Sequence, residues 1–391
     1  MKRSLLRIFI LCSLFPAVLP GQVDSLRNAA LIAREDSNKV NLLNRLAVQL
    51  AGAGNFTEAI AYAKQALTIS TTLPCENPYP NNNGPVMTGW TKGKILSYKT
   101  CAGIYYRQGN MQDAFKNYLA ALKLSEAAGD VSASAYSYTN MGNVYEVHGK
   151  YNEALQHHEA ALKIYEEKND QQGMAYAYNN LGNAYSEQNN NEKSLVYYKN
   201  ALSILQNRDD HNGIATAYNN IGTAYHSQGN YDEALKNHMQ ALQEYQNTNN
   251  QLGIAASYNN IGNVYYKYNS FKEALKYYTR ALSIQEEIGD KYGIAMTYHN
   301  MGSAMYNQEN YAEAITYFFA SISIKEIIGD KKGISRSYIN LAYTYSRLKR
   351  YKDAEKYCNR AMALAKEIGA DDIAQTAGKK LESVQAAEAG K

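Results

Sequence analysis

The chain repeats one short pattern every 40 residues, and this period limits its fold more than any other feature. A hydrophobic residue followed by a small one occurs at Met141-Gly142, Leu181-Gly182, Ile221-Gly222, Ile261-Gly262, Met301-Gly302 and Leu341-Ala342. A tyrosine lies three residues before each hydrophobic residue. An alanine lies twelve residues after the small one in every copy except one, which has Ser194. A fixed period of this length predicts a solenoid of identical supersecondary units, which offers an extended binding surface rather than a catalytic pocket.

Each copy has the pattern of two amphipathic helices joined by a tight turn. In residues 134–173, one helical face is marked at three- and four-residue steps by Tyr138, Met141, Gly142 and Tyr145. Gly149 follows, and glycine suits the left-handed conformation beyond a helix C-terminus. A second amphipathic helix over residues 151–164 completes the pair. The sequence therefore predicts an all-α fold built from antiparallel helix pairs.

Small and large residues have separate roles in this packing. Gly142 and Ala154 are expected where the two helices of one pair cross, because a larger side chain would push them apart. Tyr138, Tyr145 and His158 are expected to fill the space between successive pairs. One pair cannot bury its apolar face alone, so its stability must come from stacking on neighbouring pairs.

The positions of proline limit where the chain can be helical, and its net charge limits which partners it can bind. All 6 prolines lie at or before Pro85, so the rest of the chain is free to be helical. The formal charge of +4 includes Lys2, Arg3 and Arg7, and without them the balance is 37 basic against 36 acidic residues. Binding to nucleic acid or to anionic lipid needs clustered positive charge, which this composition does not provide.

The N-terminus has the pattern of an export signal over residues 1–21. Three basic residues accompany a short apolar run, 8–19, and Gly21 supplies a small residue before a cut at Gln22. The run is too short to span a bilayer, which needs about 20 residues. The sequence thus predicts an exported protein that is periplasmic or extracellular after cleavage. An uncleaved anchor and a simple starting helix are the alternatives.

Cysteine usage gives no disulfide framework. Three cysteines lie beyond residue 21: Cys75, Cys101 and Cys358. The last two occupy repeat positions that other copies fill with core residues, so we expect them to be small buried hydrophobic residues. The sequence contains no Cys-x-x-Cys pair for zinc or redox chemistry.

These patterns divide the chain into segments. After the signal, residues 22–70 are expected to hold an N-terminal helix and a degenerate first repeat. Residues 71–93 are expected to form a surface loop, because they contain four prolines, an Asn-Asn-Asn-Gly run and the only tryptophan, Trp90. Seven regular repeats are expected over 94–374, followed by a capping helix and tail over 375–391.

The repeat signature resembles the tetratricopeptide repeat (TPR) family. The matching pattern is hydrophobic-Gly-x-x-Tyr, then Gly-x-Tyr-x-Glu-Ala, then Ala-Leu-x-Ile, with Tyr138 where the family has tryptophan. The long period is similar to the TPR units of kinesin light chain and of the spindle-orientation protein Pins. Residues 36–44, placed after a signal, resemble exported bacterial TPR proteins, some of which are sensor portions of histidine kinases or transcription regulators. The resemblance implies a superhelical TPR solenoid whose first helices line a concave groove.

The resemblance also implies peptide-binding residues in that groove. An asparagine precedes each hydrophobic-small pair, and a second row lies three residues further along the same helical side. The candidates are Asn140, Asn180, Asn220, Asn260, Asn300 and Asn340 in the first row, and Asn143, Asn183 and Asn263 in the second. Asparagine supplies both a donor and an acceptor, which match a peptide bond. The alternative is that these side chains bond neighbouring helices and fix the superhelix.

Groove positions that differ between copies are candidates for ligand selection. They are Glu146, Glu187, His226, Tyr266, Lys267, Tyr306, Arg336 and Arg347. The set changes from acidic in the early copies to basic in the last, which favours a ligand with unlike ends. The alternative is a solvated charged face without a binding role.

Nothing in the sequence indicates catalysis. His-Glu-x-x-His, Gly-x-Ser-x-Gly and phosphate-loop patterns are absent from it. His157 and His158 cannot face one metal from a helix, because neighbouring residues point about 100° apart. His158 and His238 occupy core positions of the repeat and are expected to be packing residues. We therefore expect no enzymatic activity, no metal and no cofactor.

The sequence predicts a non-enzymatic scaffold that binds a protein or peptide partner in its groove. The alternative is a sensor subunit that binds a ligand and signals through a separate membrane kinase or regulator, since the sequence has no kinase motif. A purely structural array is a third alternative. No direct membrane insertion is expected after signal cleavage.

Overall fold

The structure is a computed structural model that describes residues 20–72 and 88–390. Within those ranges the chain consists of α-helices joined by short turns, and it forms no β-strand there. Two compact units divide the chain, Met1–Ile204 and Leu205–Lys391. None of the helices in the described ranges is both long and apolar enough to cross a membrane. The predicted all-α array of helix pairs is confirmed.

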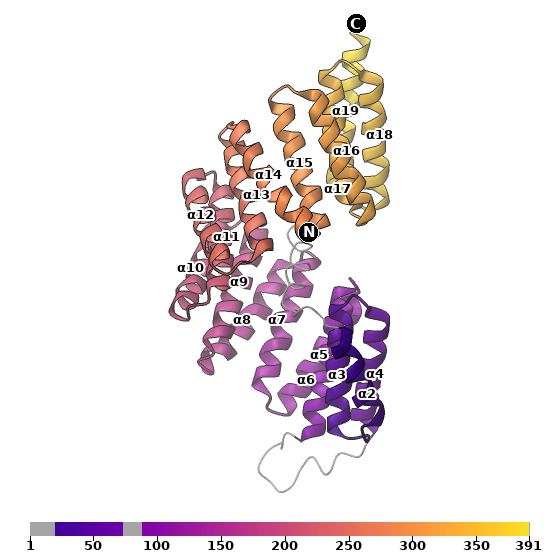
Figure 1. Cartoon of the computed structure of the whole chain (residues 1–391), viewed down its shortest axis with the longest axis vertical. Helices are drawn as coiled ribbons and strands as arrows, with labels where there is room; N and C mark the ends of the chain where they lie inside the picture. Colours follow the sequence, from indigo (N-terminus) through magenta and orange to yellow (C-terminus); the bar gives the residue numbers. More distant parts are fainter. Residues whose placement is uncertain (1–19, 73–87, 391) are drawn as a thin grey trace. The chain divides into compact units, whose positions relative to one another are not determined.

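In the first unit, a single helix precedes a stack of helix pairs (Figure 1). The single helix is α2 (Pro20–Ile32), which packs against α3. The pairs are α3 (Ser37–Gly52) with α4 (Phe56–Thr72), α5 (Gly89–Arg107) with α6 (Met111–Ala127), α7 (Val131–Val147) with α8 (Tyr151–Glu167), and α9 (Gln171–Glu187) with α10 (Asn191–Asn207). The second helix of one pair contacts the first helix of the next, as α6 contacts α7, so the stack is continuous.

The second unit is built from helix pairs in the same way (Figure 1). Its pairs are α11 (His211–Gln228) with α12 (Tyr231–Asn247), α13 (Gln251–Lys267) with α14 (Phe271–Ile288), α15 (Lys291–Asn307) with α16 (Tyr311–Ile327), and α17 (Lys331–Arg347) with α18 (Tyr351–Glu367). A last helix, α19 (Asp371–Ala389), packs against both α17 and α18. It begins before the boundary at 375 that the sequence predicted.

The predicted loop 71–93 is too long at both ends. Helix α4 continues to Thr72, and α5 already begins at Gly89. Trp90 therefore lies in a helix, where it packs against the buried cluster that contains Leu43. The rest of that predicted loop, Cys75 and most of the predicted signal 1–21 lie outside the described residues.

Local hydrogen bonds at the helix ends explain why each copy folds in the same way. An Asp or Asn side chain caps most first helices, as Asp290 Oδ1 accepts a hydrogen bond of 2.9 Å from the backbone N–H of Gly293. The turn inside each pair contains one residue in the left-handed conformation. It is Gly149 (φ 72°), Asn189 (φ 60°) or Asn269 (φ 57°) in three of the copies. These residues confirm the turn that the sequence predicted.

Glycine lets the two helices of a pair hold an aromatic ring between them. A Cβ on Gly262 would lie 2.5 Å from Cε1 of Tyr278, and a Cβ on Gly142 would lie 2.5 Å from Cε1 of His158. The predicted small residue at the helix crossing is thus confirmed. The ring of His158 packs inside its own pair, whereas the sequence had placed it between successive pairs.

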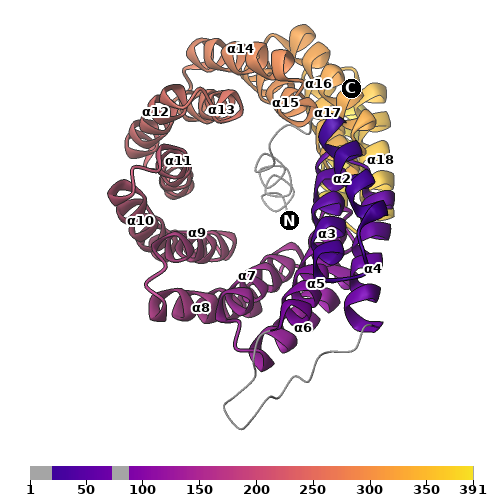
Figure 2. The same cartoon turned by 60° about the horizontal axis from the view of Figure 1, so that its bottom comes forward.

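The first helices of the second unit form one continuous face. Helices α11, α13 and α15 lie along one side, with α12 and α14 behind them (Figure 2), and each contacts the first helix of the next pair. We call this surface, made by α11, α13, α15 and α17, the first-helix face. It carries the groove candidates of the later copies.

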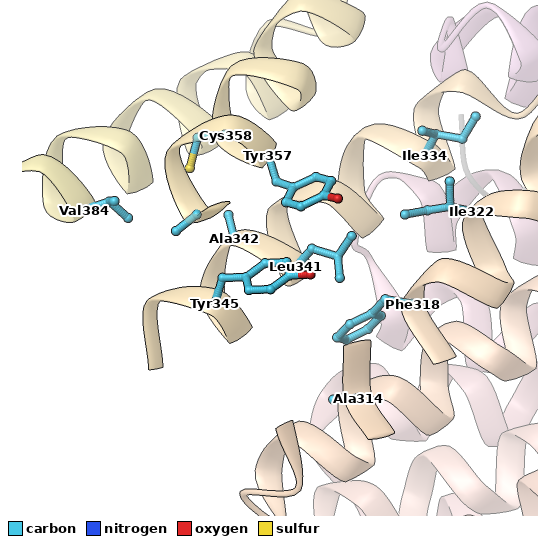
Figure 3. Close-up of a cluster of buried hydrophobic side chains, with 11 residues drawn as sticks. Ala314, Phe318, Ile322, Ile334, Leu341, Ala342, Tyr345, Tyr357, Cys358 and Val384 are labelled. Atoms are coloured by element: carbon cyan, nitrogen blue, oxygen red, sulfur yellow. The ribbon is translucent and has the colours of Figure 1, made fainter. Parts of the chain in front are cut away.

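Helix α19 covers the apolar face at the C-terminal end of the second unit. Figure 3 shows the buried cluster in which Phe318, Leu341 and Tyr357 take part. The rings of Tyr345 and Tyr357 are stacked, with 5.5 Å between centroids and 5° between planes. Val384 of α19 is fully buried in the same cluster, so α19 shields a surface that the last pair would otherwise expose.

The two described cysteines are buried, which confirms the sequence prediction. Cys101 and Cys358 carry free thiols and are 1% and 0% exposed. Burial raises the pKa of Cys101 to about 12 and the pKa of Cys358 to about 11. Both thiols therefore stay protonated at neutral pH and act as small packing groups.

Candidate binding cleft

A cleft opens on the first-helix face of the second unit. It has a volume of about 320 Å³ and is formed by side chains of α13, α15, α16 and α17. The lining residues are Tyr266, Ser303, Tyr306, Asn307, Phe318, Asn340 and Tyr343. We call this the tyrosine cleft. Three of its residues, Tyr266, Tyr306 and Asn340, are candidates that the sequence singled out.

Hydrogen bonds between helices hold the two central tyrosines in place. The hydroxyl of Tyr266 on α13 accepts a hydrogen bond of 2.7 Å from Asn307 Nδ2 on α15. The hydroxyl of Tyr306 on α15 accepts one of 3.3 Å from Arg347 Nε on α17. Both rings also make T-shaped contacts with 5.6 Å between centroids, Tyr266 with Phe271 and Tyr306 with Tyr311. The cleft is thus formed in advance of any ligand.

A chain of hydrogen-bonded side chains connects Asn340 of the cleft lining to buried polar groups behind it. Asn340 Nδ2 lies 3.2 Å from His299 Nε2, and His299 Nδ1 lies 3.1 Å from Ser337 Oγ. Lys325 Nζ donates to the same Ser337 Oγ at 3.0 Å. Burial and the nearby Lys325 ammonium lower the pKa of His299 to about 3, so its ring is neutral at neutral pH. Because the Asn340 amide donates to Nε2, we assign the ring proton to Nδ1, which donates to Ser337.

The cleft is neutral and its rim is basic. Burial raises the pKa of Tyr266, which keeps its hydroxyl protonated and able to donate. On the rim, Arg347 contacts Tyr306. Lys380 Nζ lies 4.4 Å from the centroid of the Tyr343 ring.

The cleft offers groups that can bind a ligand. Its hydroxyls and amides can donate and accept hydrogen bonds, and its aromatic rings can cover an apolar side chain. A metal would need clustered ligands, and no three His, Cys, Asp or Glu side chains come together anywhere in residues 20–72 or 88–390.

The repeat signature decides the family. The tetratricopeptide repeat model matches residues 96–167, 173–243, 213–287 and 293–367, which together make up more than half of the chain. The chain belongs to the tetratricopeptide repeat family. The TPR array thus includes every helix that contributes a side chain to the tyrosine cleft.

Solved structures support the same fold for this TPR chain. The apo form of the quorum sensor NprR from B. thuringiensis has a TM-score of 0.65 at 15% identity, over 87% of this chain and 91% of NprR. A Rap protein complexed with competence and sporulation factor has a TM-score of 0.56 at 15% identity, over 91% of this chain and 99% of the Rap protein. A STAND signal-transduction ATPase with a TPR sensor, from Pyrococcus horikoshii, has a TM-score of 0.61 at 17% identity, over 91% of this chain and 50% of the ATPase. At these identities the similarity establishes the fold and not the ligand. No curated protein sequence matches this one.

Most first-row asparagines of the later TPR copies bond neighbouring helices. Asn260 Nδ2 donates to Asn219 Oδ1 at 3.4 Å, and Asn300 Nδ2 donates to Asn263 Oδ1 at 3.2 Å. These contacts join adjacent first helices. Asn340 also bonds the neighbouring first helix, through His299 Nε2, but it lines the tyrosine cleft as well, so it stays a prediction for ligand contact.

The earlier first-row asparagines are arranged differently. Asn140 Nδ2 donates to the backbone carbonyl of Tyr136 in its own helix at 2.7 Å. Asn180 is 7% exposed, and its Nδ2 has no hydrogen-bond partner among the described residues. Asn220 is partly exposed. The tyrosine cleft includes none of these three.

The second row orients the rings that fill each pair. Asn183 Oδ1 accepts a hydrogen bond from the Tyr198 hydroxyl at 2.8 Å, and Asn263 Oδ1 accepts one from the Tyr278 hydroxyl at 2.8 Å. Asn143 is buried, at 8% exposed. The structure thus places Asn183 and Asn263 against the second helix of the same pair.

The candidates for ligand selection divide into two groups. Tyr266 and Tyr306 line the cleft, and Arg347 borders it. The other five are Glu146, Glu187, His226, Lys267 and Arg336. Lys267 is exposed beside Tyr266, whereas Glu187 and His226 are partly buried in other copies.

Two charged candidates face protein groups rather than a groove. Glu146 is 5% exposed, and its Oε1 lies 3.4 Å from Nε2 of the buried His158. Arg336 Nη2 lies 3.9 Å from Asp372 Oδ2 of α19. The interpretation of Glu146 as a groove residue needs correction, because its carboxylate is buried inside a helix pair.

Sequence reasoning missed several residues of the cleft. Ser303 and Tyr343 occupy the same repeat position as Asn263, and Asn307 occupies the same position as Lys267. The 40-residue register was therefore the signal that could have found them.

Proposed function

We propose that this TPR protein is a non-enzymatic scaffold that binds an extended segment of a protein or peptide partner in the tyrosine cleft. The observation that carries the proposal is the convergence of hydroxyls, amides and aromatic rings from three successive first helices on one face. Such a mixture matches the alternating polar backbone and apolar side chains of a peptide.

The geometry indicates how a segment would be held. Asn340 offers an amide that can pair with a peptide group, and Asn307 offers its Oδ1 to a peptide N–H because its Nδ2 already donates to Tyr266 and Ser303, each new hydrogen bond contributing about 1 kcal/mol. Tyr266, Tyr306 and Tyr343 provide aromatic surface for an apolar side chain, whose burial contributes roughly 1.5–3 kcal/mol. Because neighbouring helices already hold these groups, little ordering free energy opposes binding.

The basic rim indicates which segments are favoured. Arg347 and Lys380 contact tyrosines of the cleft, and the lining itself contains no acidic residue. We infer that the preferred segment combines an apolar or aromatic side chain with a neighbouring carboxylate. Opposite charge adds to the association rate and selects the orientation of the segment.

Proteins of the same fold support this class of function. A Rap protein has been solved in complex with competence and sporulation factor, and NprR is a quorum sensor. The Rap complex shows that an array of this fold can bind a partner, which supports a binding role for this chain.

Peptide selection followed by affinity measurement tests the proposal. Random peptides displayed on phage are selected for binding to the wild-type protein. The selected peptides are then synthesised, and their dissociation constants are measured by calorimetry. We expect Tyr306→Ala to weaken binding about 10-fold or more, because it removes an aromatic wall worth over about 1.4 kcal/mol. Asn340→Ala should weaken binding by a smaller factor, in line with one lost hydrogen bond.

A matched variant on the opposite side of the unit serves as the control. Asn359 is exposed on α18, so Asn359→Ala should leave the dissociation constant unchanged. Circular dichroism confirms that every variant is folded. Equal affinity of all three variants would place the site elsewhere, and the absence of any selected peptide would overturn peptide binding altogether.

A further inference from the structure

A larger cavity lies in the first unit, apart from the tyrosine cleft. It has a volume of about 610 Å³ and is bounded by α2, α3 and α5. Its polar lining includes Asn44, Arg45, Gln49 and Thr100, and its apolar lining includes Leu26 and Leu96. No acidic residue lines it, so Arg45 is the one charged group of the lining.

A buried amide in this lining lacks half of its hydrogen bonds. Asn44 is 1% exposed, and its Nδ2 donates to Ser97 Oγ at 2.9 Å. Ser97 Oγ in turn donates to the carbonyl of Gly93 at 2.9 Å, so it must accept from Asn44, which fixes the amide orientation. Asn44 Oδ1 then has no donor among the described residues. An unsatisfied buried carbonyl is unfavourable by about 1–3 kcal/mol, so a donor from water or from a ligand is favourable at this position.

The charged group of the lining also has no ion-pair partner among the described residues. Arg45 directly follows Asn44 on α3 and is exposed. No carboxylate among the described residues forms an ion pair with it, although Arg27 on α2 pairs with Glu58 at 2.6 Å. A guanidinium presents parallel N–H donors that match a carboxylate in two-point contact.

The wall formed by α2 is held firmly enough to define a site. Val23 and Leu26 of α2 pack against the buried cluster of α3, α4 and α5. The pair of Arg27 with Glu58 ties α2 to α4. The cavity is thus part of the folded unit.

We propose that the cavity between α2, α3 and α5 is a second binding site, which takes a small molecule bearing a free α-carboxylate and an N–H donor. Arg45 pairs with the carboxylate, the N–H group satisfies the buried amide of Asn44, and Leu26 and Leu96 contact an apolar side chain. A free amino acid and the C-terminus of a short peptide share this chemistry. The proposal does not rest on the tyrosine cleft, because the two sites share no residue.

Calorimetric titration of the whole chain tests this site. The probes are the common amino acids and a set of dipeptides, each as the free acid and as the C-terminal amide. We expect at least one free acid to bind with a single site per chain and its amide to bind at least 10-fold more weakly. Binding by amino acids identifies a free metabolite as the source, and binding by dipeptides alone identifies a peptide C-terminus.

Three variants connect any binding to the cavity. Arg45→Gln should weaken binding at least 10-fold. Arg34→Gln, which changes an exposed arginine that does not line the cavity, should have no effect. Tyr306→Ala should also have no effect, which separates this site from the tyrosine cleft. The proposal is overturned if no free acid binds at millimolar concentration, if amides bind equally well, or if Arg45→Gln binds like the wild type.

Discussion

Gly262→Ala is expected to lower the free energy of unfolding of the second unit by about 3 kcal/mol. The new methyl group would lie 2.5 Å from Cε1 and 2.7 Å from Cδ1 of Tyr278. That ring is 1% exposed, and its hydroxyl donates to Asn263, so it has no room to move away. The strain outweighs the gain of about 1 kcal/mol in helix propensity that alanine brings. Thermal and urea unfolding followed by circular dichroism measures the change.

The same substitution at a helical glycine with open space provides the control. A Cβ on Gly378 in α19 would meet only Met362 Sδ, at 3.7 Å. Gly378→Ala should therefore raise the free energy of unfolding, by about 0.5–1 kcal/mol. Equal effects of the two substitutions would show that close approach to the ring does not determine the role of Gly262.

The helix pairs could be predicted because each copy contains the residues that decide its own structure. Gly149 for the turn, Gly142 for the crossing and His158 for the core act on neighbours within 20 residues of sequence. The absence of proline after Pro85 leaves the later helices unbroken. When such local preferences agree in every copy, the pattern alone specifies the stack.

The hydrogen-bond partners of the first-helix face could not be predicted in the same way. Asn259 Nδ2 donates to Thr297 Oγ1 at 2.7 Å, and His299 Nδ1 lies 3.1 Å from Ser337 Oγ, each across 38 residues. These contacts depend on the offset and rotation between neighbouring first helices, which a sequence period does not specify. Asn260, which directly follows Asn259, was selected instead because an asparagine recurs at its repeat position in six successive copies.

The tyrosine cleft could be predicted only in part, for the same reason. Tyr266 and Tyr306 were identified because they vary between copies. Tyr343 and Phe318 line the cleft with them only because α16 and α17 bring these side chains to one place. The first unit differs again, since Glu146 at the position of Tyr266 turns toward the buried His158. One repeat position therefore serves packing in one copy and an exposed site in another.

Lys325→Met is expected to stabilise the protein at pH 7 and to lose this advantage above pH 10. Lys325 is 2% exposed, and its ammonium donates to Ser337 Oγ at 3.0 Å and to the carbonyl of Gly333 at 3.5 Å. Burial lowers its pKa to about 8, although the carboxylate of Asp330 acts in the opposite direction. Compared with the ordinary value of 10.5, a folded pKa of about 8 corresponds to roughly 3 kcal/mol of destabilisation wherever the lysine is charged.

The pH dependence distinguishes burial of charge from ordinary packing. Between pH 8 and 10.5 the unfolded chain binds more protons than the folded one, so the stability of the wild type rises with pH. Methionine keeps the length of the side chain but has no charge, which removes this rise. At pH 7 we expect a net gain of about 1–2 kcal/mol, because the lost hydrogen bonds offset part of the relieved burial.

Lys352→Met on the exposed surface of α18 is the control and should change stability little at either pH. Thermal unfolding at pH 7 and at pH 10 measures the stability difference between Lys325→Met and the wild type. The same difference at both pH values would contradict a buried ammonium.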